Sequence, residues 1–436
     1  MNLVREIQTL PLEKCMSAII DYRGKTPRKT TSGVPLITAK IVKAGRIEAP
    51  TEFIDPLEYD GWMSRGLPQV GDVLLTTEAP LGEVAQLADD HVALAQRLIL
   101  LRGNPDILDN TFLKYLMMSE SVQSQLKARA SGTTVTGIKQ SELRKVTLSL
   151  PPVNEQCAIA SVLGSLDDKI EQNRQTAQVL ERFAGTIFRA WFVDFEPVKA
   201  KASGAASFPS LSQTVLDALP TTFEDSELGP LPKGWEVGEV TSMAALSKLQ
   251  VVPQTSGGEL FDHFSIPAFD DGMREAVETG DAIKSNKFLV IQGCVLLSKL
   301  NPRTPRVWLP PVPRGRRQVA STEFLVLVPR SAFDRSYLYC QFQQPAFRDE
   351  IAQGASGTSN SHQRVRPSDL LQKAVIISPP SIREAFADVA DPLFALVAAT
   401  RAESAVLAEI RDYLLPKLIS GEVQVAHDTK TREARV

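Results

Sequence analysis

Four stretches of the chain contain several basic residues and no acidic one. They cover residues 22–47, 121–141, 299–317 and 354–368. In a chain with a net charge of −3, this local segregation of charge is what phosphate binding requires, because Lys and Arg displace counterions from a nucleic acid while Ser, Thr and backbone N–H groups fix its register. Taken singly, each stretch is equally consistent with an ordinary solvated loop.

Two of these stretches occupy equivalent places in a repeated sequence. ASGTTVTGIKQSELRKVTLSLPPVNEQ starts at Ala130, and ASGTSNSHQRVRPSDLLQKAVIISPPSIRE starts at Ala355. Each has a Gly/Ser/Thr turn, a polar stretch, a short apolar run, two prolines and a helical pattern. We therefore predict one DNA-reading loop in each half. The residues expected to contact DNA are Arg23, Lys25, Arg28, Lys29, Arg129, Thr133, Thr134, Lys139, Lys299, Arg303, Arg306, Ser361, His362, Arg364 and Arg366.

No common catalytic motif is recognisable in the sequence. The GKT run at 24–26 resembles the end of a P-loop, but Ile19 stands where its first glycine is needed and Pro27 where a helix should start. The DDK run at 167–169 could imitate part of a nuclease site, yet a solvated helix face is the simpler interpretation. LPPV and SPPS lack the flanking residues of an amino-methyltransferase motif, and the four histidines are scattered. We expect no catalytic residue, cofactor-binding residue or metal ligand, and a binding protein instead of an enzyme.

The bulk properties predict two or three domains in a reducing compartment. A chain of 436 residues exceeds the usual size of one hydrophobic core. Its four cysteines are far apart and form no CxxC pair. No apolar run is long enough to span a membrane, and the start MNLVREIQ lacks the apolar core of a signal peptide. These features favour a cytoplasmic protein.

Further pairs of segments extend the repeat. GDVLLTTEAPLGEVAQL from Gly71 parallels GCVLLSKLNPRTPRVWL from Gly293, and QRLILLR from Gln96 parallels TEFLVLVPR from Thr322. Each contains the short β-rich run of a buried strand. Because the matches keep the same order at nearly one offset, a duplicated domain is the better explanation.

A long helical pattern follows each pair of prolines. In the first, apolar or small residues recur in steps of three and four from Ile159 to Trp191, with the polar Asn173 in the same series. In the second, the expected series is Ile382, Phe386, Val389, Leu393, Leu396, Leu407, Ile410 and Leu414, interrupted at Thr400 and Glu403. We predict that the two helices pack against each other; the alternative is that they are core helices of two separate domains. Pro392 is expected to kink or start the second helix, and Pro416 to end it.

These elements predict an α+β chain with two tandem mixed α/β domains, separated by two long antiparallel coiled-coil helices, with an internal pseudo-two-fold repeat; the family resemblance described below implies that both are target-recognition domains. The expected boundaries are 1–152 for the first recognition domain, 153–197 for the central helical spacer, 198–233 for a linker with a short helix around 212–219, 234–380 for the second recognition domain, 381–425 for the distal helical spacer and 426–436 for a flexible tail.

The helical segments resemble a known family. LPPVNEQCAIASVLGSLDDKIEQNRQTAQVLERFAGTIFRAWFVDFEPV is similar to the central region of the specificity subunits of type I restriction–modification systems, above all over 166–173 and in WFVDFEPV. The second copy resembles their distal region, especially in RDYLLPKLISGE. DYRGKTP, FDHFSIPAFDDG and SKLNPRTPRVW resemble parts of their target-recognition domains, so that the resemblance covers nearly the whole chain.

The resemblance implies a non-catalytic subunit that reads a bipartite DNA target. It implies that two methyltransferase subunits and, where present, two restriction subunits dock on the chain, and that S-adenosylmethionine, ATP and Mg²⁺ act in those partners and not in this chain. DYRGKTP and FDHFSIPAFDDG have no counterpart in the other half, which predicts an asymmetric target. Exposed Trp191 and Phe192 are expected to serve docking, unless they pack under their own domain. Two alternatives are a coiled-coil adaptor that links two protein-binding domains without binding DNA, and a DNA enzyme with a divergent active site.

Overall fold

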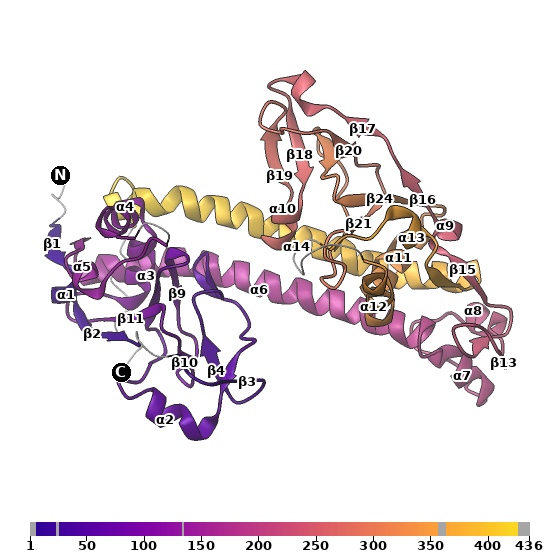
Figure 1. Cartoon of the computed structure of the whole chain (residues 1–436), viewed down its shortest axis with the longest axis horizontal. Coiled ribbons are helices and arrows are strands. Elements are labelled where there is room, and N and C mark those ends of the chain that lie inside the picture. The colour runs from indigo at the N-terminus through magenta and orange to yellow at the C-terminus, as the bar shows by residue number, and fades with distance from the viewer. Residues whose placement is uncertain (1–5, 23–25, 133–134, 356–362, 426–436) are drawn as a thin grey trace. The chain divides into compact units, whose positions relative to one another are not determined.

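The computed structural model describes residues 6–22, 26–132, 135–355 and 363–425 (Figure 1). The predicted tail and the predicted DNA contacts Arg23, Lys25, Thr133, Thr134, Ser361 and His362 lie outside these residues. The chain divides into a first unit, residues 1–172 with 404–436, and a second unit, residues 173–403. Within the described residues, none of the helices combines the length and the apolar character needed to cross a membrane.

The first unit is built on an antiparallel sheet of four strands in the order β2-β11-β8-β9. Both faces of this sheet are covered, which explains the continuous apolar runs of its strands. Val73 and Leu75 of β8 face the helices α3 and α4, while Leu74 between them faces a smaller sheet. The elements are β2 (Met16–Asp21), β8 (Val73–Thr77), β9 (Leu81–Gln86), β11 (Leu98–Gly103), α3 (Asn110–Met118) and α4 (Glu120–Arg129).

Smaller elements complete the first unit. A second sheet has the order β10-β4-β7-β3, β5 and β6 form a hairpin, and β1 pairs with β12. Their bounds are β1 (Gln8–Pro11), α1 (Leu12–Cys15), β3 (Lys29–Thr30), β4 (Val34–Ile37), β5 (Val42–Lys43), β6 (Arg46–Ile47), β7 (Phe53–Ile54), η1 (Pro56–Glu58), α2 (Tyr59–Trp62), β10 (Ala93–Leu94), α5 (Gln140–Leu143) and β12 (Thr147–Leu150).

The second unit repeats the main elements of the first in the same order. Its sheet β16-β24-β21-β22 corresponds to β2-β11-β8-β9, and the pair β15-β25 corresponds to β1-β12. The repeat expected from the sequence is thereby confirmed. The bounds are β15 (Glu236–Glu239), α9 (Val240–Met243), β16 (Ala244–Ser247), β21 (Val295–Ser298), β22 (Val307–Trp308), β24 (Phe324–Pro329), α11 (Asp334–Gln343), α12 (Pro345–Gln353), α13 (Pro367–Leu371) and β25 (Ala374–Ile377).

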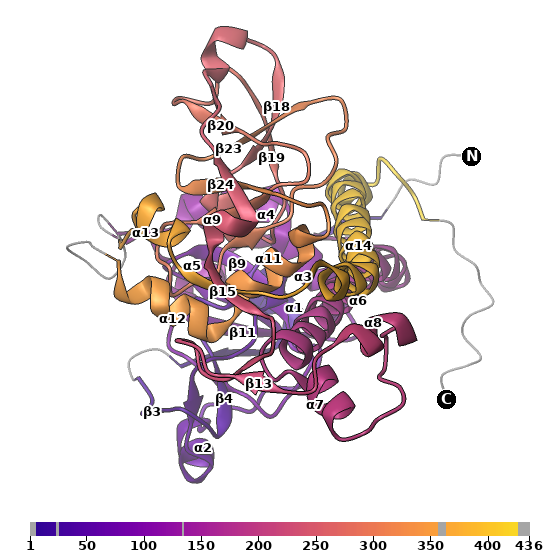
Figure 2. The same cartoon turned by 90° about the vertical axis from the view of Figure 1, so that its right-hand side faces the viewer.

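The units differ in their second sheet. In the second unit this is a five-stranded sheet in the order β17-β20-β23-β18-β19, in which β18 and β23 run parallel (Figure 2). The FDHF run forms part of β18, and α10 follows it, so the segment without a counterpart in the first half belongs to this sheet. The bounds are β17 (Gln250–Val251), η2 (Pro253–Ser256), β18 (Leu260–Phe264), α10 (Ile266–Asp270), β19 (Ala276–Thr279), β20 (Lys287–Leu289) and β23 (Arg317–Ala320).

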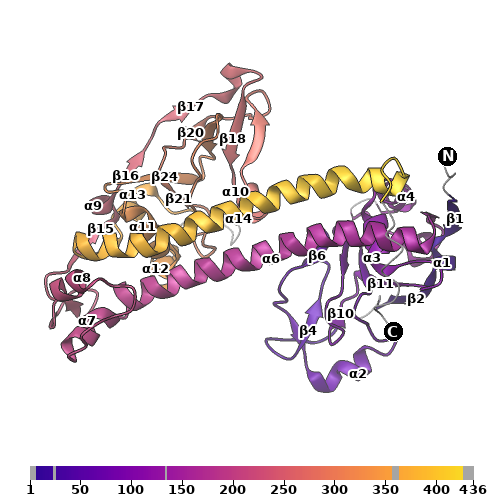
Figure 3. The ribbon, with the colours of Figure 1, turned by 180° about the vertical axis from the view of Figure 1, so that it is seen from behind.

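The two long helices are α6 (Val153–Phe192) and α14 (Pro380–Ser420), each an uninterrupted ribbon in Figures 1 and 3. Their segments in each unit pack together in antiparallel directions. In the first unit Asp167 Oδ1 accepts a hydrogen bond from Arg411 Nη1 at 2.8 Å. In the second unit Asn173 Nδ2 donates to Glu403 Oε2 at 2.8 Å, and Trp191 packs on Phe386. The predicted pairing of the two helices is therefore present within each unit.

The structure corrects the expected start at Pro392, the expected end at Pro416 and the expected contact face of α14. The helix begins at Pro380 and continues through Pro392, and it ends only at Ser420, beyond Pro416. Its contact face is also rotated, because Leu396 and Ile410 are 50% and 41% exposed. Phe394, Val397 and Thr400 are buried instead. A helix rich in alanine offers several possible faces, and the large Phe386 and Phe394, two turns apart, select the one that packs best, while Pro392 lies on the exposed side.

The segment expected as a linker is part of the second unit. It contains α7 (Glu196–Ala202), α8 (Gln213–Ala218), β13 (Phe223–Glu224) and β14 (Leu231–Pro232), and α8 matches the predicted short helix. Val198, Leu216 and Leu231 are 0%, 2% and 3% exposed and join the core of that unit. Burial of these apolar side chains explains why a composition typical of a linker does not give a free tether here.

Candidate nucleic-acid interface

The repeated Gly/Ser/Thr turn is tied to the end of a central strand in the first unit. Ser131 and Gly137 exchange backbone hydrogen bonds of 2.9 and 3.0 Å, which close the turn. Ile138 N donates to Thr77 O at 3.0 Å, so the turn is fixed beside the last residue of β8. Gly132 has φ +124°, and an added Cβ would lie 2.1 Å from Val135 O, so this turn requires glycine.

The equivalent segment of the second unit is held in the same way. Val365 N donates to Lys299 O at 3.0 Å, and Asn301 N donates to Gln363 O at 2.8 Å. Lys299 directly follows β21, the counterpart of β8. Each unit therefore places a basic, acid-poor segment at the same end of the same strand of its main sheet.

Among the predicted DNA contacts of the first unit that the structure describes, most are exposed. Arg28, Lys29 and Lys139 are exposed, and Arg129 is half-buried. Lys29 Nζ lies 2.8 Å from Glu52 Oε2, and Arg129 Nη1 lies 3.7 Å from Glu142 Oε2. Such surface pairs are weakly held, so these cations remain able to exchange a carboxylate for a phosphate.

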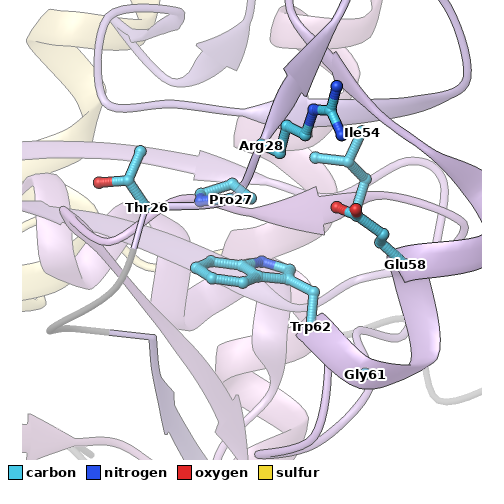
Figure 4. A pocket seen from close by; sticks show the side chains of 7 residues that line it. All are labelled: Thr26, Pro27, Arg28, Ile54, Glu58, Gly61 and Trp62. Carbon is cyan, nitrogen blue, oxygen red and sulfur yellow. The ribbon is translucent and has the colours of Figure 1, made fainter.

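Arg28 lies beside an open cavity of about 550 Å³ (Figure 4). The Trp62 indole forms its floor, donates from Nε1 to Leu94 O at 3.0 Å and stacks on Tyr22 with ring centroids 6.0 Å apart. The cavity thus combines a fixed aromatic plane with a guanidinium group, which are groups that contact nucleic-acid bases and phosphates. It is lined by Thr26, Pro27, Arg28, Ile54, Glu58, Gly61 and Trp62.

Two of the predicted contacts of the second unit form ion pairs at close range. Arg306 donates from Nε and Nη2 to both oxygens of Asp270 at 2.7 and 2.8 Å, and only 10% of its side chain is exposed. Arg364 lies 3.0 Å from Glu323 Oε1 with 48% of its side chain exposed. Arg303 and Arg366 are exposed, and Lys299 is half-buried. Arg306 therefore holds α10 in place, and it would have to release Asp270 to contact a ligand. The other described residues remain predicted contacts.

Arg316 and Arg317 of the 299–317 stretch were not among the DNA contacts predicted from the sequence. Arg316 Nε donates to Asp262 Oδ1 at 2.5 Å. Arg317 forms a bidentate ion pair with Glu259, in which Nε and Nη2 each donate to one carboxylate oxygen at 2.6 Å. Their carboxylate partners lie 54 and 58 residues away in the sequence. Only their membership of an acid-poor stretch could have drawn attention to them.

Two further expectations are corrected by burial. Trp191 and Phe192 are 2% and 1% exposed and pack against Phe386, so they cannot form a docking surface and the alternative of packing under their own domain holds. Asp167 is not on a solvated helix face, since it accepts hydrogen bonds from Lys114, the Tyr115 hydroxyl and Arg411. Burial disfavours its ionised form, but these partners outweigh burial and hold the pKa of Asp167 below the ordinary value.

The described residues contain no group of three or more His, Cys, Asp or Glu side chains that could hold a metal ion. The thiols of Cys294 and Cys340 are buried in the second unit, and burial raises the pKa of Cys294 to about 12. These cysteines are therefore packing residues.

The chain consists of two repeated α+β units, and each of them contains a segment of both long helices. The type I restriction modification DNA specificity domain matches residues 62–182. The type I restriction enzyme MjaIX specificity subunit of Methanocaldococcus jannaschii is 27% identical over 368 residues, which cover 81% of this chain and 78% of that protein. The HindI specificity subunit of Haemophilus influenzae is 24% identical, with 77% of this chain and 82% of that protein covered.

A solved structure has the same fold. The crystal structure of the S subunit of a type I restriction–modification system from M. genitalium superposes with a TM-score of 0.55 at 13% identity, covering 96% of this chain and 97% of that one. Over most of its length the chain is therefore similar to type I restriction specificity subunits. The expected fold class is confirmed, and the names of the relatives agree with the prediction that this is not the catalytic chain.

Proposed function

We propose that this chain reads a bipartite, asymmetric DNA sequence, one half-site by each unit, and assembles with two methyltransferase subunits and, in a restriction complex, with restriction subunits. The observation that carries the proposal is the pair of basic, acid-poor segments fixed at the same end of β8 and β21. The main sheets of the two units are equivalent, but their smaller sheets differ in strand order. The two units would therefore present different side chains to the DNA. We further propose that S-adenosylmethionine, ATP and Mg²⁺ bind to the partners.

The two long helices would set the spacing between the half-sites. Both helices pass from one unit into the other, since the boundaries of the units fall at 172–173 in α6 and 403–404 in α14. Insertion of one heptad into each helix adds ~10 Å of helix length. We expect the preferred spacer of the DNA target to change while both half-sites stay the same.

The test combines methylation and spacing. The chain is co-expressed with its methyltransferase subunit, and the methylated motifs of the host genome are read by single-molecule sequencing. A two-part motif, together with a shifted optimum for the heptad variant on duplexes of graded spacer length, would support the proposal. A continuous motif, or an unchanged optimum, would contradict it.

Docking would use apolar side chains that the helices leave exposed. In the second unit Val179 and Phe183 of α6 are 54% and 53% exposed and lie one turn apart. In the first unit Val406, Ile410 and Tyr413 form a stripe on α14 with exposures of 54%, 41% and 64%. Exposed apolar side chains grouped on one helix face are typical of a protein interface.

A matched pair of substitutions tests the docking surface. Phe183→Ala should leave the stability of the chain nearly unchanged, because the ring is exposed, and weaken methyltransferase binding by about tenfold or more if Phe183 is an anchor. Thr186→Ala removes an exposed side chain from the same helix and should leave binding unchanged. Titration of the methyltransferase subunit by calorimetry distinguishes them. Equal affinities for both variants would exclude this face.

A further inference from the structure

A buried carboxylate in the five-stranded sheet of the second unit holds one edge of an arginine. Asp262 lies in β18 with 2% exposure, and Arg316 stands directly before β23. Arg316 Nε donates to Asp262 Oδ1 at 2.5 Å, and the Arg316 side chain is 38% exposed. A buried carboxylate is stable when a cation accompanies it, so this pair has a fixed geometry while the rest of the guanidinium group reaches solvent.

The free edge of Arg316 distinguishes it from its neighbours. Among the described residues, no hydrogen-bond partner is found for its Nη1 and Nη2 groups. Arg317, the next residue, uses Nε and Nη2 on Glu259, and its Nη2 also donates to Ser256 at 2.8 Å. Arg306 uses the same two groups on Asp270. Arg316 therefore presents two parallel donors outward, whereas the forks of Arg306 and Arg317 are already occupied.

The segment that carries Arg316 is anchored at its other end. Gln318, which is opposite Asp262 in the parallel pair of β18 and β23, donates from Nε2 to Pro311 O at 3.1 Å. Between these anchors the chain turns at Gly315, where φ is +82°. Residues 311–316 are thus fixed to the sheet by two buried polar side chains, Asp262 and Gln318, at 2% and 3% exposure.

Two exposed aliphatic side chains belong to the sheet and the segment that carry the pair of Arg316 and Asp262, and the half-buried Glu275 lies close enough to Asp262 to interact with it electrostatically. Val277 lies opposite Asp262 in the antiparallel pair of β18 and β19, so both side chains are on one face of the sheet, and Val277 is 49% exposed. Val312, in the anchored segment, is 66% exposed. Exposed aliphatic side chains beside a fixed donor pair match the edge of stacked bases better than the hydrated phosphate backbone.

We infer that Arg316 reads a guanine in the half-site of the second unit, with Asp262 as its positioning residue. Nη1 and Nη2 would donate to O6 and N7 of that guanine, the pairing that a planar two-donor group makes in the major groove. The inference rests on the proposed DNA-reading function and specifies it to one base. Arg316 is a specificity-determining residue in this account, and Asp262 acts through it.

The test compares methylated motifs in four complexes. The wild-type chain, Arg316→Ala, Asp262→Asn and Arg317→Ala are each co-expressed with the methyltransferase subunit, and the genomic motifs are determined. Arg316→Ala should turn one required guanine of one half-site into a degenerate position. Discrimination between a guanine and an adenine there, measured by DNA binding of the complex, should fall by about ten- to a hundredfold.

The other two variants separate positioning from charge. Asp262→Asn leaves the arginine in place but weakens its orientation, so the same guanine should become partly degenerate while affinity for unrelated DNA stays as in the wild type. Arg317→Ala removes a neighbouring cation whose fork is occupied, and it should leave the motif intact. A melting curve for each complex shows whether a variant has folded.

The outcomes are distinguishable. A uniform loss of methylation at all sites in Arg316→Ala would mean that Arg316 contacts phosphate, and the inference would be wrong. An unchanged motif, or relaxation at an A·T position, would also overturn it. If the wild-type complex methylates no two-part motif, the proposed function itself fails.

Discussion

The start of each long helix is joined to the neighbouring helix by a buried polar side chain, and this side chain differs between the two units. In the first unit Gln156, in the first turn of α6, donates to Pro151 O at 2.8 Å and to Ile107 O at 2.9 Å, and it accepts from Asp109 N at 3.0 Å. In the second unit Arg383, in the first turn of α14, donates from Nε to Ser378 O at 3.0 Å and forms an ion pair with Asp334 of α11. Gln156 and Arg383 are 0% and 8% exposed.

The comparison of Gln156 with Arg383 shows that the repeat preserves the role of this side chain and not its chemistry. Both side chains bind the carbonyl just before their long helix and join it to the start of α3 or α11. The first unit uses a neutral amide, and the second uses a buried pair of opposite charges. Polar groups at a buried junction must be satisfied, but the chemistry that satisfies them is free to change when the partner changes with it.

The C-terminal ends of α6 and α14 also keep one role with different side chains, since both pack into a hydrophobic core. Phe188, Trp191 and Phe192 of α6 are buried in the second unit. Leu415, Leu418 and Ile419, at the end of α14, pack into the core of the first unit. One half fills the position with aromatic rings and the other with aliphatic side chains, so volume is redistributed while the role of the helix end is retained.

Substitutions of Arg383 and Gln156 are expected to reduce the stability of their units more than any other change considered. Arg383→Ala leaves the Asp334 carboxylate buried without its cation and should destabilise the second unit by about 3–5 kcal/mol. Gln156→Ala leaves backbone groups unsatisfied and should cost the first unit about 1–3 kcal/mol. Urea unfolding, followed by hydrogen exchange in peptides from β21–β24 and from β8–β11, measures each unit separately.

The double variant Asp334→Asn with Arg383→Gln makes the second junction neutral, like the first. It should recover much of the stability lost in Arg383→Ala, because no buried charge remains. Equal losses for the single and the double variant would show that the packing of Arg383, and not its charge, stabilises the junction.

The two units should also respond differently to acid. Burial raises the pKa of Asp334 above the usual 3.8, although Arg383 opposes the shift, whereas the partners of Asp167 hold its pKa below 3.8. The raised pKa of Asp334 means that its contribution to stability is lost as pH rises from 3.8 through its folded value. The lowered pKa of Asp167 means that its contribution is present above 3.8 and is lost as pH falls below it.

Between pH 5 and pH 3, the Asp334 contribution should therefore favour the second unit, and the Asp167 contribution should weaken the first. Asp334→Asn and Asp167→Asn each remove one titrating group and should flatten the pH dependence of its own unit only. Hydrogen exchange of the same two sets of peptides across this pH range provides the measurement. Parallel pH profiles in wild type and both variants would contradict the assignment.

The sequence allowed prediction of the repeat, the strands of the main sheets and both long helices, because apolar periodicity and turn residues are local patterns. The residue-level register at the start of the long helices is not visible in the sequence. Alignment on the paired prolines matches Gln156 with Glu384, whereas the strands and helices match it with Arg383. A proline pair marks the start of a helix only to within a residue, and backbone hydrogen bonds decide the rest.

The candidate site was harder to predict. The basic segments could be located, since absence of acidic residues is visible in the chain itself. The pairing of Arg316 with Asp262 and of Arg306 with Asp270 depends on strand order in a sheet that has no counterpart in the first half. Exposure of α14 side chains also depended on which helix face the bulky residues select, which no periodic pattern in an alanine-rich segment specifies.

The smallest expected effect concerns Lys139 and Arg366, which occupy one position of the repeat. Each is the exposed residue that precedes a short helix, α5 in the first unit and α13 in the second. If each contacts a phosphate, Lys139→Ala and Arg366→Ala should each weaken DNA binding a few-fold and lower the salt dependence by about one counterion. Because a phosphate carries no sequence information, neither variant should alter the methylated motif.

Duplexes in which only one half-site is intact make this comparison decisive. Lys139→Ala should reduce the salt slope on the duplex that retains the half-site of the first unit, and Arg366→Ala on the duplex that retains the other, so that the two slopes change in a crossed pattern. If both substitutions act on the same duplex, the two positions are not equivalent in DNA binding, and the structural repeat does not extend to the contacts. The crossed pattern would instead mean that duplication of the fold carried one phosphate contact into each half while the base-reading residues diverged around it.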